Sequence, residues 1–242
     1  MNASAHRYKV ISLDLDDTLW DAAPTLSRAE QCVYDWLGAN YPELAQRCSI
    51  ETMREHRRRL ADAEPHLRHD LSILRRTSLA RLALDAGHPE EVADAAMAVF
   101  LEARNEVTFY PEVVPVLERL RREFRLVALS NGNADVRRTG LGHLFDHAFS
   151  PAHVGTAKPD PAMFQAVMSA TGVTAADIVH VGDEPGTDIL GAQRAGVRAV
   201  WVNRSGCQWP GEVCPPDAEI ATLADLPAVL GRWWGGALAA TA

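Results

Sequence analysis

Three acidic side chains crowd together near the start of the chain, directly after an apolar run. The segment VISLDLDDT contains Asp14, Asp16 and Asp17. Two like charges about 4 Å apart repel by roughly 4 kcal/mol at an effective dielectric constant of about 20, so a partner has to offset this repulsion. In an extended chain, Asp14 and Asp16 point to one side and Asp17 to the other. Asp14 and Asp16 are therefore candidates for chemistry, and Asp17 for a turn.

Other polar residues follow later apolar runs in the same way. Ser130 and Asn131 follow RLVAL, Lys158 lies in GTAKPDP, and Asp183 and Asp188 lie in GDEPGTD. Carboxylate oxygens are the ligands that Mg²⁺ prefers, and hydroxyl and ammonium groups can bind phosphoryl oxygens. The combination favours a site for phosphate chemistry.

Two aligned aspartates with a cation could transfer a phosphoryl group. Mg²⁺ between Asp14, Asp16 and Asp183 would offset their repulsion and draw a phosphate in. Asp14 could attack phosphorus while Asp16 protonates the leaving oxygen and later takes a proton from water. Taken singly, most of these residues also fit a turn, a helix cap or a surface charge. Their joint occurrence at separate strand ends favours catalysis.

The elements that must position these residues alternate along the chain. Five short apolar runs rich in valine and isoleucine are expected to be strands, because they are too short for helices. They are residues 10–14, 125–131, 147–150, 177–183 and 198–203. Helical patterns lie at residues 111–123, 159–171 and 186–196. This alternation predicts an α/β fold with a Rossmann-like parallel sheet, whose ligands bind at the carboxyl ends of the strands.

A long helical segment interrupts this alternation. Nearly all of residues 22–107 has helical patterns, with Leu71, Leu74, Leu79, Leu82 and Leu84 at roughly helical spacing. We expect residues 1–20 and 109–242 to form the catalytic core and residues 21–108 to form an inserted, all-helical cap domain. Inserts at the active end of a sheet often act as lids.

Composition limits the classes of partner. The chain has 242 residues and a net charge of −8, which disfavours binding to nucleic acid. No apolar run approaches the roughly 20 residues that span a bilayer, and residues 1–10 lack the apolar segment of a signal peptide. The four cysteines have no metal-binding spacing and suit a reducing compartment. We expect a cytoplasmic monomer or homodimer that acts on a small phosphorylated metabolite, with no nucleic-acid or membrane partner.

The motifs, taken in order, resemble those of the haloacid dehalogenase-like (HAD) hydrolase superfamily, phosphatase type. They are DLDDT at 14–18, Ser130 after LVAL, Lys158 in AKPDP and GDEPGTD at 182–188. The resemblance covers the whole chain. It implies a Rossmann-like core with a helical cap inserted after the first motif, a C1 cap in the usage of the family.

The resemblance also implies a role for each motif residue. Asp14 would be the nucleophile and Asp16 the general acid and base. Ser130 and Lys158 would bind the transferring phosphoryl group. Asp183 would bind Mg²⁺ together with Asp14 and the backbone carbonyl of Asp16.

Three further residues of the motifs are candidates with looser roles. Asp188 fits the second acid of the last motif, which binds the metal or orients its ligand shell or Lys158. Asn131 could add hydrogen bonds near the phosphate or only shape its turn. Thr18 is a candidate for contact with the phosphate or for orienting the first loop.

The presence of Asp16 separates reactions within the superfamily. Dehalogenases attack carbon, need no metal and lack an acid at this place, so phosphate chemistry is favoured here. Phosphomutases keep both acids and stay an alternative. A non-catalytic phospho-sensor is a less favoured alternative, because receiver domains are half this length and have no cap.

A narrower resemblance rests largely on residues of the cap and of the segments that flank the motifs. WDAAPTL, AEPHLRHDLSILRR, ALSNGNADV, GLGHLF and HVGDEPGTDILGAQRAG are similar to a bacterial branch of flavin-pathway phosphatases. That branch acts on 5-amino-6-(5-phospho-D-ribitylamino)uracil, with side activity on FMN and sugar phosphates. Riboflavin biosynthesis is therefore one implied setting.

Residues outside the motifs are candidates for substrate selection. Trp20 could stack on a flat ring or pack at the hinge of the cap. The remaining candidates are His69, Asp70, Arg75, Arg76 and Asn133. Residues 69 and 76 lie two helical turns apart and could share a face towards the crevice, although a solvated helix face would have the same pattern.

Overall fold

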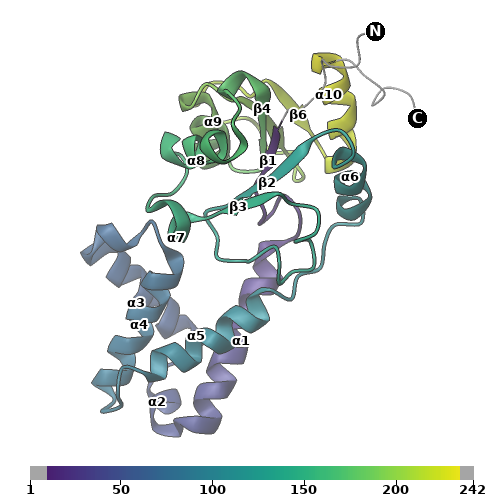
Figure 1. The fold of residues 1–242 in the computed structure, drawn as a ribbon. Coiled ribbons are helices and arrows are strands. Elements are labelled where there is room, and N and C mark those ends of the chain that lie inside the picture. The colour runs from purple at the N-terminus through teal and green to yellow at the C-terminus, as the bar shows by residue number, and fades with distance from the viewer. Residues whose placement is uncertain (1–9, 235–242) are drawn as a thin grey trace.

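A six-stranded parallel sheet forms the core of the protein (Figure 1). A computed structural model describes residues 10–234. The strands are β1 (Val10–Leu13), β2 (Arg125–Leu129), β3 (His147–Phe149), β4 (Ile178–Gly182), β5 (Arg198–Val202) and β6 (Ala218–Ile220). Their order in the sheet is β3-β2-β1-β4-β5-β6, so β1 lies between β2 and β4. The predicted α/β class and parallel sheet are confirmed, and the ends of β1, β2 and β4 lie side by side.

Helices cover both faces of the sheet, which explains the near-continuous apolar strands. On one face, Ile11 and Leu13 pack with α6 (Val113–Leu120) and α10 (Leu226–Trp234). On the other, Val10 packs with α8 (Pro161–Thr171) and α9 (Leu190–Arg194). Alternate residues of each strand therefore serve two different hydrophobic clusters.

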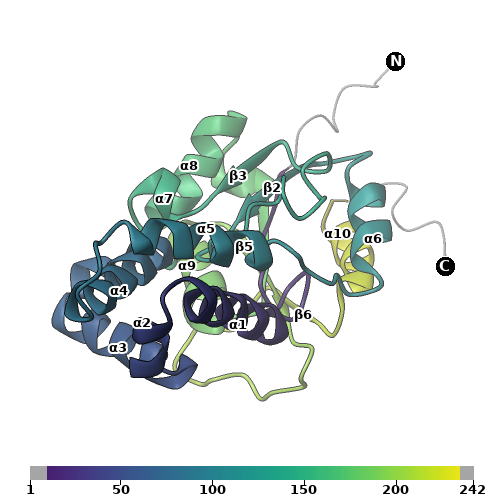
Figure 2. The same ribbon diagram turned by 90° about the horizontal axis from the view of Figure 1, so that it is seen from below.

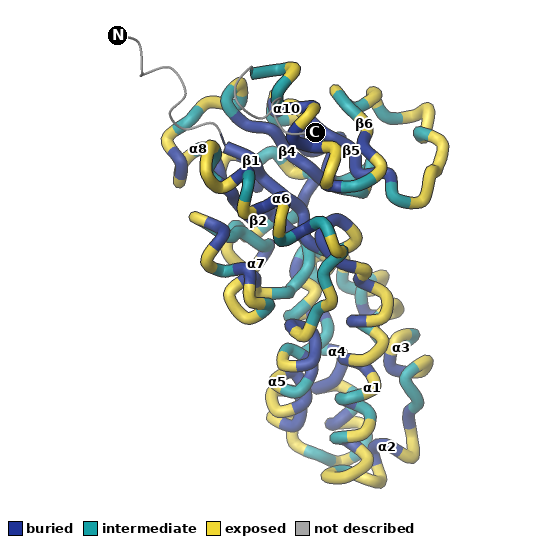
Figure 3. Tube along the Cα trace, turned by 90° about the vertical axis from the view of Figure 1, so that its right-hand side faces the viewer, coloured by how far each residue is buried: buried dark blue, intermediate teal, exposed yellow. Residues whose placement is uncertain are grey.

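Five helices between β1 and β2 form a bundle of their own (Figures 1 and 2). They are α1 (Ala22–Asn40), α2 (Pro42–Arg47), α3 (Ile50–Ala63), α4 (Leu71–Asp85) and α5 (Val92–Arg104). A separate hydrophobic cluster fills the bundle, so its helices bury one face each. Figure 3 shows this pattern, with stretches of buried and exposed residues alternating along the helices. We refer to this bundle as the cap.

Short elements complete the core and differ in part from the predicted ones. α7 (Pro151–Val154) follows β3, and three-residue 3-10 helices lie at Pro65–Leu67, Ala175–Asp177 and Leu223–Asp225. The segment predicted as one helix at 186–196 divides into a π-helical turn (Pro185–Ile189) and α9. The strand β6 was not predicted, because its three residues Ala218, Glu219 and Ile220 have no strong apolar run.

The leucines of α4 do not form one buried stripe. Leu74 and Leu79 lie in the interior, whereas Leu71 and Leu84 are 46% and 55% exposed. Within residues 10–234, no helix combines the length and the apolar character that a membrane span requires.

Candidate active site

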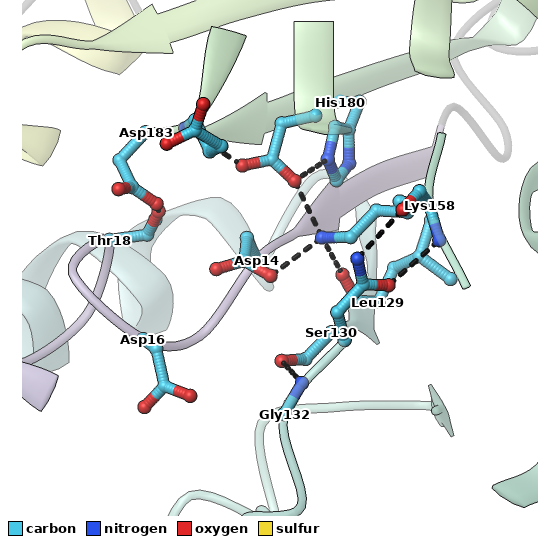
Figure 4. Close-up of polar contacts among 12 residues, drawn as sticks. Asp14, Asp16, Thr18, Leu129, Ser130, Gly132, Lys158, His180 and Asp183 are labelled. Carbon is cyan, nitrogen blue, oxygen red and sulfur yellow. Dashed lines mark hydrogen bonds and ion pairs between the residues drawn. The ribbon is translucent and has the colours of Figure 1, made fainter. Parts of the chain in front are cut away.

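Asp14 is the first residue after β1 and lies at the carboxyl edge of the sheet. Its backbone N–H donates to the carbonyl of Val181 at 2.9 Å, which extends the pairing of β1 with β4 by one residue. The side chain is buried, and Lys158 Nζ lies 2.6 Å from Asp14 Oδ1 (Figure 4). A buried carboxylate held by a single ammonium group is suited to act as a nucleophile at this edge.

Lys158 is fixed by hydrogen bonds at both ends of the residue. Its ammonium group donates to Asp14, to Asp188 and to the carbonyl of Leu129, each at 2.6 Å. Asn131 clamps the Lys158 backbone, since its Oδ1 accepts from the Lys158 N–H at 2.7 Å and its Nδ2 donates to the Lys158 carbonyl at 2.8 Å. The structure therefore gives Asn131 a contact with Lys158 that the sequence did not indicate.

Asp188 organises the far side of this ammonium group. Its carboxylate accepts from Lys158, from the Glu184 N–H at 3.0 Å, and faces His180 Nε2 at 3.2 Å. The π-helical turn brings Asp188 back against the end of β4, where a Cβ on Gly182 would come within 2.3 Å of its side chain. Gly182 is therefore needed for this close approach.

One lysine cannot neutralise the neighbouring carboxylates. Burial raises the pKa of Asp14 well above its usual value, and the charge of Lys158 only partly counters this effect. Burial acts in the same direction on Asp188, but Lys158 and His180 outweigh it and lower the pKa of that carboxyl group. Burial and the charge of Asp188 raise the pKa of Asp183 to about 7. The site therefore holds more negative charge than its own residues stabilise.

Three of these carboxylates are close enough to share a cation. Ligand oxygens of Asp14, Asp183 and Asp188 all lie within 4.8 Å of one another. The excess of buried negative charge and the all-oxygen donor set both fit a hard divalent cation. Thr18, whose hydroxyl lies 3.3 Å from Asp183 Oδ1, supports this group and does not line the cavity.

Asp16 lines the same cavity, but its carboxylate does not converge with that of Asp14 (Figure 4). Arg104 Nη2 lies 2.6 Å and 2.5 Å from its two oxygens, and Trp20 Nε1 donates to it at 2.9 Å. The expectation of two aligned side chains is not met, because β1 ends at Leu13 and the following loop turns at Asp17, with φ 58°. Asp17 is a turn residue that accepts from the backbone of α1.

Arg104 is a functional candidate that the sequence did not indicate. It is the last residue of α5, is 1% exposed, and its Nε and Nη1 have no hydrogen-bond partner among the described residues. Burying a guanidinium whose only side-chain hydrogen bonds here are to one carboxylate costs free energy of folding. A functional role at Asp16 is therefore favoured over a purely structural one. Gly132 packs against the pair, since a Cβ there would lie 2.5 Å from Asp16 Oδ2.

Two further polar residues behind the site were also missed. His180 of β4 is fully buried, and its Nδ1 lies 2.9 Å from Ser12 Oγ of β1. Burial lowers the pKa of His180, which keeps the imidazole neutral near pH 7. In the sequence, His180 and Ser12 stand out only as single polar residues within apolar runs.

Ser130 lies where the sequence placed it. It directly follows β2, is buried, lines the cavity, and its Oγ accepts from the Gly132 N–H at 2.9 Å. Its hydroxyl hydrogen is free to be donated into the cavity.

The cap residues His69, Arg75 and Arg76 do not share a face towards the crevice. Arg75 Nη1 binds Glu30 at 3.0 Å inside the cap, and Arg76 pairs with Asp94 on the surface. His69 precedes α4, and its Nδ1 lies 2.6 Å from the His66 carbonyl. None of these side chains is among the residues that line the cavity.

Three other candidates serve as supports in the structure. Trp20 is fully buried and packs against Phe109, so neither face of its ring is open to a ligand. Asp70 caps the N-terminus of α4. Asn133 Nδ2 lies 3.1 Å from Ser72 Oγ and so connects the loop after β2 to the cap.

The site contains an open cavity of about 600 Å³, a volume that includes solvent at its mouth. Asp14, Ser130, Lys158 and Asp183 lie in its wall, at the carboxyl edge of the sheet. From the cap, Leu71 contributes to the same wall. The arrangement provides a nucleophile, a cation site and donors for an anion around one space.

The fold and this site define a hydrolase with a Rossmann-like core. A family model for haloacid dehalogenase-like hydrolases matches residues 8–196, and the chain belongs to this family of enzymes.

Known proteins similar to the chain include phosphatases and a dehalogenase. The 5-amino-6-(5-phospho-D-ribitylamino)uracil phosphatase YigB of Escherichia coli is 31% identical over 93% of this chain and 97% of its own length. The phosphoserine phosphatase of Thermus thermophilus is 38% identical over 58% of each chain. A crystal structure titled 2-haloacid dehalogenase, from Pseudomonas syringae, has a TM-score of 0.87 and 44% identity over 93% of this chain and 99% of its own.

Proposed function

We propose that the protein is a Mg²⁺-dependent phosphomonoester hydrolase that works through a phosphorylated Asp14. The arrangement that carries this proposal is the buried Asp14 carboxylate, 2.6 Å from Lys158 Nζ, with Asp183 and Asp188 in reach of a shared cation. The phosphatases among the similar proteins support it. The four cysteines are free thiols, which fits an enzyme of the reducing cytoplasm.

The residues of the chain would act in two steps. An oxygen of Asp14 attacks phosphorus and forms an acyl phosphate, while the bond from phosphorus to the leaving oxygen breaks and Asp16, which enters this step in its protonated form, gives that oxygen its proton. Asp16 then takes a proton from a water molecule, which attacks phosphorus and releases inorganic phosphate and free Asp14. Ser130 and Lys158 bind the phosphoryl oxygens where negative charge spreads in the transition state.

Asp14 and Asp183 are the residues that would hold the metal. Asp188 already accepts three hydrogen bonds, so we assign it the task of orienting Lys158. When bound, Mg²⁺ supplies the positive charge that lets a dianionic phosphate approach an ionised Asp14.

The first candidate for the substrate is 5-amino-6-(5-phospho-D-ribitylamino)uracil, the compound named for the similar protein of Escherichia coli. FMN and sugar phosphates are further candidates. A panel of phosphorylated metabolites, assayed for phosphate release with Mg²⁺ and with the Asp14→Asn variant as blank, tests both the reaction and the substrate. Absence of phosphate release from every ester of the panel would contradict the proposal.

Hydrolytic dehalogenation is a second candidate, favoured by the 44% identity to the structure titled 2-haloacid dehalogenase. That reaction needs Asp14 to attack carbon and displace halide, and it needs no metal. Halide release from 2-chloropropionate in the presence of EDTA would favour this candidate over phosphate hydrolysis.

A further inference from the structure

Leu71 brings an exposed apolar side chain from the cap to the wall of the active-site cavity. Three large apolar side chains of α4 are exposed, namely Leu71 at 46%, Ile73 at 48% and Leu84 at 55%. Of these, Leu71 alone is among the residues that line the cavity. A scattered exposed leucine needs no explanation, but one that faces a catalytic cavity offers contact area to whatever enters it.

The position of Leu71 is fixed by its two neighbours. Asp70 caps α4, with its Oδ1 accepting from the Ser72 N–H at 2.8 Å and from the Ile73 N–H at 3.1 Å. Ser72 Oγ lies 3.1 Å from Asn133 Nδ2, on the loop that begins with the phosphate-binding candidate Ser130. The cap therefore holds Leu71 in place relative to the phosphate end of the site.

The remainder of the cavity wall is acidic. Six of its side chains are carboxylic acids and one, Lys158, is basic. At the exposed rim, Asp17 accepts from the Ala22 N–H at 2.9 Å and Glu184 from the Gly186 N–H at 3.3 Å, so backbone amides hold these two carboxylates. At the start of α4, the N–H groups of Ser72 and Ile73 are already used by the side chain of Asp70. No guanidinium from the described part of the cap lines the cavity to receive a second anion.

We propose that Leu71 determines specificity by contacting the leaving group, and that the acidic rim restricts this group to uncharged ones. The inference rests on the proposed function, since it specifies the substrate class of that phosphomonoesterase. An ester with a neutral, partly apolar leaving group packs against Leu71 without facing Asp17 and Glu184 as a like charge. A carboxylate or a second phosphate on the leaving group meets repulsion at the rim, which also argues against a bisphosphate mutase.

Two esters of nearly equal size test this selectivity with the full-length, Mg²⁺-loaded protein. 3-Hydroxypropyl phosphate ends in a neutral hydroxymethyl group, and 3-phosphooxypropanoate ends in a carboxylate at the same place. We expect the wild-type protein to prefer the neutral ester by about tenfold in kcat/KM, because a screened like charge at the rim opposes the other ester. Leu71→Lys should bring this preference to about one, chiefly by raising kcat/KM for the carboxylate ester.

Leu84→Lys is the matched control, because it adds the same charge at a similarly exposed leucine at the other end of α4. It should keep the wild-type preference, whereas Glu184→Gln should lower it by about threefold. Equal preferences for Leu71→Lys and Leu84→Lys, or a wild-type preference for the carboxylate ester, would overturn the inference. Failure of the wild-type protein to hydrolyse either ester or any other phosphomonoester would instead reject the proposed function.

Discussion

The cap and the core each bury one charged side chain among several of opposite sign, but the excess charge differs between them. In the cap, Glu30 binds Arg54, Arg57 and Arg75 at 2.5, 2.7 and 3.0 Å. This cluster has excess positive charge, and the Arg54 side chain is 42% exposed, so water can stabilise the surplus.

In the core, the roles of the signs are reversed. Lys158 is shared by Asp14 and Asp188, with Asp183 beside them, and the side chains of the three paired residues are 1–10% exposed. The paired side chains are therefore largely shielded from water, although the cavity beside them is open to solvent. A cluster whose surplus charge is hydrated serves stability, whereas a cluster whose charged groups are largely shielded from water requires a ligand of opposite charge.

The largest expected effect follows from removing the nucleophile. Asp14→Asn should lower kcat for p-nitrophenyl phosphate by at least about 10⁴-fold. It should not lower the midpoint of thermal unfolding, because ionised Asp14 is unfavourable in the metal-free protein, as its raised pKa indicates. Asp21→Asn, a change of the same kind at the exposed cap of α1, should retain activity. A large loss of stability in Asp14→Asn with activity intact would contradict the comparison.

Removal of the metal should have the next largest effect. EDTA should lower activity by at least about 10³-fold, and added Mg²⁺ should restore it. Mg²⁺ at about 100 times its dissociation constant should stabilise the wild-type protein by roughly 2.7 kcal/mol, seen as a higher unfolding midpoint. Asp183→Asn should lose this shift, since it removes one proposed ligand. If Mg²⁺ still raised the unfolding midpoint of Asp183→Asn to the same extent, the cation would bind at a site that does not include Asp183.

Breaking the pair between Arg104 and Asp16 should mainly affect protonation of the leaving group. Arg104→Met removes the contact that positions the Asp16 carboxyl group for proton transfer. It should therefore lower kcat by about 10²-fold for alkyl phosphates, whose leaving groups need a proton, and by less for p-nitrophenyl phosphate. Arg76→Met breaks the exposed pair with Asp94 and should change kcat less than twofold. Equal losses with both classes of ester would argue for a structural role of Arg104.

Disruption of the cap cluster should have the smallest effect on activity and a clear one on stability. Burial opposes ionisation of Glu30, but hydrogen bonds from its three arginines lower its pKa. The carboxylate therefore contributes stability that is complete above its unfolded pKa of about 4.3 and is lost as the pH falls through the lower folded value.

Glu30→Gln should cost about 2 kcal/mol in denaturant unfolding at pH 7, and the difference from the wild-type protein should shrink below pH 4. Glu55→Gln, at a partly exposed glutamate paired with Arg58 and Arg59, should cost less than about 0.5 kcal/mol. A cost for Glu30→Gln that stays constant down to pH 3 would indicate lost packing and not lost charge.

The core of the site could be predicted from sequence because its residues follow strands. The ends of neighbouring parallel strands must meet, which places Asp14, Ser130 and Asp183 together once the strands are recognised. The fold class followed from the same alternation of strands and helices.

The contacts of the cap could not be predicted, because they depend on how each helix is rotated. The side chains of Arg104 and Asp16 meet across 88 residues of sequence, and Arg75 turns inwards to Glu30. His180 and Ser12 were missed for another reason, since one polar residue within a buried strand does not reveal its partner.

Mass spectrometry of the acid-quenched Asp16→Asn variant is the most direct test of whether Asp14 attacks phosphorus. This variant keeps the nucleophile and lacks the carboxylate that would activate water, so the acyl phosphate should accumulate with Mg²⁺ and p-nitrophenyl phosphate, a substrate whose leaving group needs no proton. We expect one phosphoryl group on the peptide that contains Asp14. An unmodified Asp14 during steady release of p-nitrophenol, or a phosphoryl group on another residue, would contradict it.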